Sequence, residues 1–181
     1  MRAIAVVVAL LVLGASICSA TTVIPMSVEE LTAAATQVIE ARAVSSRSAW
    51  NAEHTLIFTY TTFEVQRALK GAASPTITVK QLGGSAEGYT QKVAGVRYAQ
   101  TGEQTVLFLR PSAAADGTFV VVGLMQGHFR VYQSGDGSVL ATNGVTASTM
   151  LEENSTQVTT RAARMPIRLS DLESRVLRGQ Q

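Results

Sequence analysis

Cysteine is almost missing from this chain, which has one cysteine in 181 residues. That residue, Cys18, lies in an apolar stretch near the N-terminus. One thiol forms no disulfide within the chain and cannot build a thiolate metal site, so the fold has to be held by its hydrophobic core. Because 46% of the residues are hydrophobic, a single core of sufficient size is feasible.

Charged and aromatic residues are also few, at 15% and 6% of the chain. The net charge of +2 is too small to indicate nucleic acid or an anionic membrane as a partner. Aspartate occurs only as Asp116, Asp136 and Asp171, and glycine follows the first two, as is typical of turns. The carboxylates therefore leave little for paired acid and base catalysis.

Signatures of catalysis are missing as well. The sequence has no nucleophile elbow, no zinc-binding HExxH, no phosphate-binding glycine loop and no calcium loop. His54 borders an expected strand and His128 alternates outward on another, and neither has a partner at metal-ligand spacing. We therefore expect no enzyme, no cofactor and no metal site.

The N-terminus has the pattern of a signal peptide. Arg2 is followed by an apolar run of about 11 residues, against roughly 20 for a membrane-spanning helix. Small residues then lead to a cleavage site after Ala20, so we expect residues 1–20 to be removed and the protein to be secreted or periplasmic without a transmembrane anchor. Lipidation of Cys18 is an alternative, although Ile17 before it is bulky for such a site.

In the remaining chain, apolar and polar residues alternate with the period of two that is typical of an all-β protein. A short helix is predicted over residues 27–35, where Ser27 and Glu30 form a capping box. Short strands follow, over residues 37–43, 55–68, 76–80, 106–109, 119–122, 128–132 and 139–141. The long second strand favours a curled sheet, and we predict a small OB-like β-barrel over residues 21–142.

Residues 143–181 are predicted to form an irregular segment and a C-terminal helix, which a capping box of Ser170 and Glu173 starts and Gly179 ends. Five arginines gather in this part: Arg161, Arg164, Arg168, Arg175 and Arg178. They are typical of a solvated helix face, and the alternative is a docking patch for an acidic partner.

Two expected loops are candidates for the surface that binds a partner. The only tryptophan, Trp50, lies in the polar residues 45–53, where a large ring is typical of a binding anchor or folds back to cover the core. Residues 85–104 have no clear period and include Tyr89, Arg97 and Tyr98. Connections of that length are usually functional or mobile.

A motif pattern over residues 38–131 resembles a group of exported bacterial proteins whose strand order is similar to the OB barrel of netrin-like domains, which include the tissue inhibitors of metalloproteinases. It consists of Thr59, Phe63 and Val65, then Leu69-Lys70-Gly71, Gly83-Gly84, Gly102-Glu103, Val106-Leu107-Phe108-Leu109 and Gln126-Gly127-His128-Phe129.

The resemblance implies a wedge that enters a protease cleft, made of Thr21, Thr22 and the loop over residues 45–53. Inhibitors of that type begin with a disulfide-held cysteine, whereas the chain has Thr21 there. The sequence predicts a secreted, non-enzymatic protein-binding module, and the resemblance implies an exported protease as its partner. Its expected binding residues are Thr21, Thr22, Trp50, His54, Tyr89 and Arg97. The alternative is an envelope-associated docking protein without inhibitory activity, which would use the arginine-rich tail.

Overall fold

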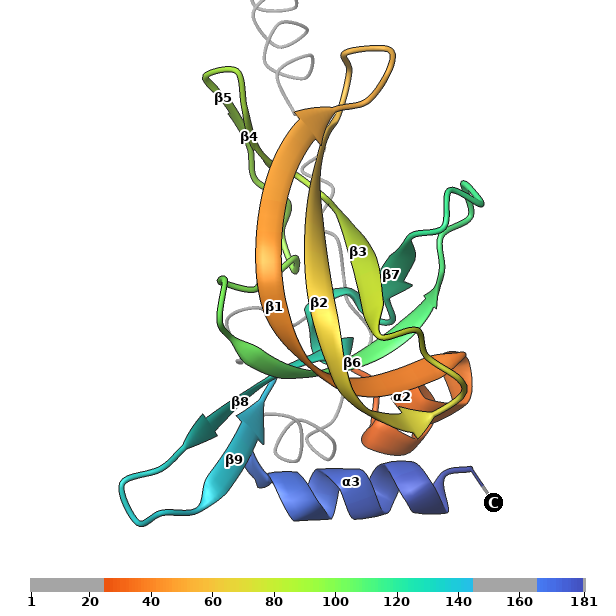
Figure 1. Cartoon of the computed structure of the whole chain (residues 1–181), viewed down its shortest axis with the longest axis vertical. Helices are drawn as coiled ribbons and strands as arrows, with labels where there is room; N and C mark the ends of the chain where they lie inside the picture. The colour runs from red at the N-terminus through yellow and green to blue at the C-terminus, as the bar shows by residue number, and fades with distance from the viewer. Residues whose placement is uncertain (1–24, 145–165, 181) are drawn as a thin grey trace, which may run out of the picture.

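The chain folds around a strongly curved β-sheet, with two helices packed at one end (Figure 1). The computed structural model describes residues 25–144 and 166–180, so the predicted signal peptide, Thr21 and Thr22 lie outside the described residues. A predominantly β fold, as expected from the sequence, is confirmed. The main sheet contains β1 (Gln37–Trp50), β2 (Ile57–Lys70), β3 (Thr76–Leu82), β6 (Gln104–Pro111), β7 (Phe119–Val121), β8 (His128–Gln133), β9 (Val139–Thr142) and β10 (Ile167–Arg168).

Five strands of the main sheet pair in a closed series that begins and ends at β1. β1 pairs with β2 along one edge and, through residues 37–42, with β6 along the other. β2 pairs with β3, β3 meets β7 in a parallel pair of Val79 with Phe119, and β7 pairs with β6. These five strands form a ring of pairings, and β8, β9 and β10 extend the sheet from β6.

β1 is longer than the sequence predicts. The sequence predicts a loop over residues 45–53. This prediction is wrong for residues 45–50, which form the second half of β1. Ala43 pairs with Phe63 and Ser45 with Thr62, so Val44 is the extra residue of a β-bulge. A bulge bends its strand and shifts the alternation of side chains between the two faces. β1 therefore leaves β6 and continues with β2 as a projecting hairpin (Figure 1).

Hydroxyl groups join the projecting part of this hairpin. The Ser46 and Thr61 hydroxyls are 3.3 Å apart, and the Ser48 and Thr59 hydroxyls are 2.9 Å apart. Cross-strand pairs of this kind stabilise a sheet without apolar side chains. The serines that resemble a loop in the sequence are therefore one half of a polar ladder.

The hydrophobic residues form two cores on opposite faces of β6. Val106 and Phe108 belong to the core under the helices, whereas Leu107 and Leu109 belong to the core inside the ring of strands. The prediction that residues 106–109 form a strand covered on both faces is confirmed. The inner core also contains Ile39, Ala41, Ala43, Phe63, Ile77, Val79 and Ala99.

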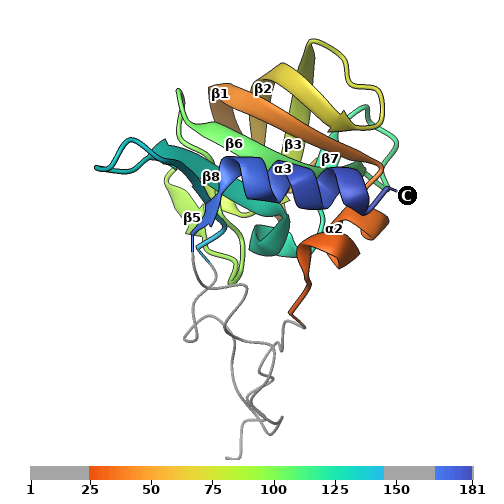
Figure 2. The same ribbon diagram turned by 90° about the horizontal axis from the view of Figure 1, so that it is seen from below.

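Two helices cover the outer face of the sheet and lie beside each other in Figure 2. Helix α2 (Val28–Ala34) begins with the predicted capping box, in which Ser27 and Glu30 exchange hydrogen bonds. Helix α3 (Leu169–Arg178) ends at Gly179 as predicted, but its predicted capping box is wrong. The helix already begins at Leu169, and Glu173 pairs with Arg67 of β2.

None of the helices within residues 25–144 and 166–180 is long and apolar enough to cross a membrane.

Residues 85–104, where the sequence shows no period, include part of a hairpin of β4 (Gly84–Ala86) and β5 (Tyr89–Gln91). Gly84 places this hairpin directly against the projecting part of β1 and β2. A Cβ atom at Gly84 would lie 2.3 Å from Thr59 Oγ1 and 2.4 Å from Ser48 Oγ, and the φ angle of this glycine is +130°. Only glycine permits this approach of the hairpin to the polar ladder.

We expect Gly84→Ala to lower the free energy of unfolding by about 2 kcal/mol, because backbone strain and the contact with Thr59 add together. Gly88→Ala is the matched control, since Gly88 has a φ of +82° but open space around its Cβ position. It should cost only the strain, about 1 kcal/mol. Urea unfolding of both variants measures the difference, and equal losses would show that the close approach is unimportant.

Candidate functional site

Three rings meet where the β1–β2 hairpin and the β4–β5 hairpin lie together, and we call them the aromatic tip: Trp50 and His54 of the first hairpin and Tyr89 of the second. The Trp50 ring stacks on His54, with centroids 5.4 Å apart and planes 19° apart. Tyr89 approaches Trp50 with its edge, at 5.6 Å and 70°. The structure thus brings together three residues that the sequence singles out for binding, although Trp50 is the last residue of β1 and not part of a loop.

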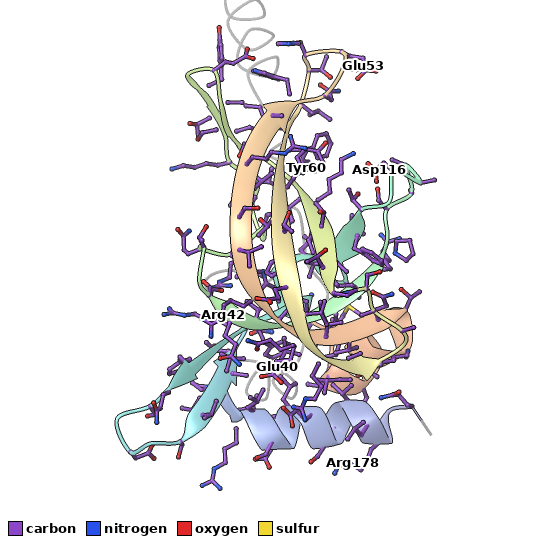
Figure 3. The ribbon with its side chains drawn as sticks, in the orientation of Figure 1. Glu40, Arg42, Glu53, Tyr60, Asp116 and Arg178 are labelled. Atoms are coloured by element: carbon purple, nitrogen blue, oxygen red, sulfur yellow. The ribbon has the colours of Figure 1, made fainter. Side chains whose placement is uncertain are left out.

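Asn51 organises the loop that carries His54. Its Oδ1 accepts hydrogen bonds from the backbone N–H groups of Thr55 and Leu56, at 2.8 and 2.9 Å. Its Nδ2 donates to Glu53, which marks this loop in Figure 3. His54 has a φ of +53°, and its backbone N–H donates to the Asn51 carbonyl. These bonds hold the loop that places the imidazole ring over Trp50, and Asn51 belongs to no motif that marks it in the sequence.

Tyr89 is presented by a tight turn. Glu87 and Gly88 both have positive φ, as a two-residue type I′ hairpin requires, and Ala86 pairs with Tyr89 across the turn. The Tyr89 side chain is 66% exposed. By contrast, the Trp50 Nε1 atom is buried and has no hydrogen-bond partner among the described residues. The tip therefore combines an exposed phenol with an indole whose donor is unused.

Arg97 lies elsewhere, so the expected binding residues do not form one surface. Its guanidinium Nη1 is 2.7 Å from Glu103 Oε1 and 2.9 Å from His128 Nε2. Because arginine only donates hydrogen bonds, His128 Nε2 accepts and the ring proton resides on Nδ1. His128 Nδ1 is buried without a hydrogen-bond partner among the described residues. Thr21 and Thr22 are outside the described residues.

The prediction that His128 alternates outward is wrong, because its side chain is only 1% exposed. His128 pairs with Leu107 across β6 and so shares the face of the inner core. That face is closed by the loop that carries Arg97 and Glu103. Gln81 of β3 donates to the Arg97 carbonyl at 2.8 Å and holds this loop in place.

Burial and the contacts among Arg97, Glu103 and His128 shift the pKa values of Glu103 and His128. Burial alone would raise the pKa of Glu103, but contacts with His128 and Arg97 outweigh it and lower that pKa to about 2. Burial lowers the pKa of His128 below its ordinary value, although Glu103 opposes the shift. At neutral pH an ionised Glu103 and a neutral His128 thus surround Arg97. With so little exposure, His128 can position the loop but cannot contact a substrate from solvent.

The arginine-rich tail is partly used within the fold. Arg175 of α3 makes two hydrogen bonds to Glu29 of α2, at 2.8 and 2.6 Å. Arg168 and Arg178 are exposed, and Figure 3 shows Arg178 at the end of the molecule that carries α3. Arg161 and Arg164 lie outside the described residues. Among the residues that are described, no group of three or more histidine, cysteine, aspartate or glutamate side chains could hold a metal ion.

Comparison with known proteins adds no relative: no protein-family model matches this chain, and no curated protein matches it.

Proposed function

We propose that this chain is an exported, non-enzymatic protein-binding module that holds its partner with the aromatic tip. One observation carries the proposal: two separate hairpins bring Trp50, His54 and Tyr89 into ring contact, with Tyr89 left mostly exposed. Tryptophan and tyrosine are the side chains that most often dominate binding energy in protein interfaces.

The tip also has the rigidity that a binding surface needs. The Asn51 hydrogen bonds and the tight turn before Tyr89 order the rings before any partner arrives. An ordered surface loses less conformational entropy on binding, so more of its contact energy becomes affinity.

The arrangement of strands supports an OB-like scaffold as part of this proposal. The ring of β1, β2, β3, β7 and β6, with a parallel pair between β3 and β7, is the order expected for a five-stranded OB barrel. In that fold the loop between the first two strands commonly binds ligands. The aromatic tip includes this loop, which agrees with the resemblance to netrin-like domains and directs the search for a partner to exported proteases.

Tyr89→Ala tests the proposal, because the substitution removes an exposed ring and leaves the rest of the hairpin in place. Loss of a central aromatic contact should cost about 2 kcal/mol, or roughly 30-fold in Kd. Leu177→Ala is the control, since Leu177 is an exposed apolar side chain of α3 at the other end of the molecule. The partner is sought among the proteins that both the wild type and Leu177→Ala capture from the producing organism's culture fluid, and Tyr89→Ala is then expected to capture much less of it.

The captured protein is then purified and titrated with each variant by surface plasmon resonance. Equal affinity of Tyr89→Ala and the wild type would contradict binding by the tip. If the partner is a protease, its peptide-cleaving activity is measured with increasing amounts of the module. A fall in activity indicates an inhibitor, and unchanged activity indicates binding without inhibition.

A further inference from the structure

An open depression of about 700 Å³ lies beside the sheet, away from the aromatic tip. Three arginines from separate parts of the chain line it: Arg42 of β1, Arg97 of the loop before β6 and Arg130 of β8. Figure 3 shows Arg42 near the middle of the molecule, whereas Glu53 at the tip is at one end. The sequence does not suggest this convergence, because the three residues are far apart along the chain.

Two of these arginines, Arg42 and Arg130, have no ion pair among the described residues. Glu103 is the carboxylate among the described residues that line the depression, and Arg97 already lies 2.7 Å from it. Arg42 donates to the Gly102 carbonyl at 3.2 Å and makes no ion pair within the described part of the chain, although Glu64 is its register partner on β2. Arg130 is exposed and has no ion pair there either.

Three arginines and one carboxylate line the depression, and Glu64 of β2 lies beside Arg42 as its register partner. Guanidinium groups bind carboxylate and phosphate oxygens through paired hydrogen bonds, and neutral polar side chains nearby can donate further hydrogen bonds to such an ion. Gln100, Thr101 and Gln104 form a polar wall of such side chains. The buried contacts of Arg97 with Glu103 and His128 fix one guanidinium, while Arg42 and Arg130 can still reach a ligand.

We propose that this depression binds a compact dianion, a phosphate group or a dicarboxylate, through the arginines that line it. This site is separate from the aromatic tip and does not depend on the proposed binding function. The ligand lies against the polar wall, and Arg97 closes the inner side.

The purified protein is titrated with inorganic phosphate and, in a second arm, with succinate, at constant ionic strength, and backbone amide shifts are followed by NMR. We expect saturable shifts in residues 100–104 and 130 in at least one arm, and the tighter arm identifies the ligand class. Arg42→Gln and Arg130→Gln should each weaken binding at least five-fold. Arg110→Gln, an exposed arginine outside the depression, should bind as the wild type does.

Because Arg42 and Arg130 are exposed, their variants should melt within about 2 °C of the wild type, which separates lost binding from lost folding. The proposal is overturned if neither dianion produces saturable shifts at these residues. It is also overturned if Arg110→Gln loses as much affinity as Arg130→Gln, since the ions would then respond only to overall charge.

Discussion

Replacement of Leu172 by alanine is expected to lower the free energy of unfolding by about 3–4 kcal/mol. Leu172 of α3 is fully buried, with an exposed fraction of 0%, in the core that α2, β6 and β8 share. Shortening this side chain removes apolar contacts and leaves a cavity, and both effects destabilise the fold. Urea unfolding followed by circular dichroism measures the change.

Leu177→Ala is the matched control, because Leu177 lies on the same helix but is 55% exposed. It should change the free energy of unfolding by less than about 0.5 kcal/mol. If the two variants were equally stable, α3 would be an accessory tail, as the docking alternative requires. The expected difference instead makes α3 part of the core, so that deletion of this helix could not be used to test docking without damaging the fold.

Glu103→Gln is expected to lower the free energy of unfolding by about 1–2 kcal/mol at pH 7, because it leaves Arg97 without its ion-pair partner beside the buried His128. The pKa of Glu103 is about 2 in the folded chain, below its ordinary value of 4.5. Its ionised form therefore stabilises the fold fully above pH 4.5, and this stabilisation is lost as the pH falls toward 2. The partial exposure of Arg97 limits the pH-dependent part to about 1–2 kcal/mol.

Protonation of His128 also lowers the stability of the fold at low pH, but for a different reason. Its pKa lies below the ordinary 6.5 in the folded chain, so the fold favours the neutral ring and loses stability as the pH falls below 6.5. Urea midpoints measured from pH 7.5 to pH 3 should therefore decline for the wild type. In Glu103→Gln the decline below pH 4.5 should be smaller than in the wild type, because other carboxylates such as Glu29 and Asp136 also have lowered pKa values, whereas the exposed variant Glu64→Gln should follow the wild type. Parallel curves for all three proteins would contradict this account of the cluster.

Local patterns in the sequence predicted the elements whose cause is local. The capping box of Ser27 and Glu30 identified the start of α2, and the Asp-Gly pairs at Asp116 and Asp136 identified two turns. The apolar run over residues 106–109 identified a strand covered on both faces. Each of these signals involves neighbours within a few residues, so the chain carries them without help from distant contacts.

The incorrect predictions have a different physical origin. Residues 45–50 read as a loop because their partners are Thr59 and Thr61 on another strand and not apolar neighbours. His128 was expected on the surface because only one face of β8 was assigned to a core, whereas the loop with Arg97 covers the other face. In both cases the structure depends on a contact with a distant part of the chain, and the pattern within one strand does not show such a contact.

The candidate site, too, was predictable from the sequence only in part. Trp50, His54 and Tyr89 are conspicuous in the sequence as aromatic or amphipathic residues in polar surroundings, but their contact depends on two hairpins that Gly84 brings together. The amino-acid sequence by itself determined that the chain is β-rich, lacks disulfides and has few catalytic groups. Only the tertiary structure decided which side chains meet, because residues far apart along the chain become neighbours only when strand pairing and burial fix their separation and environment.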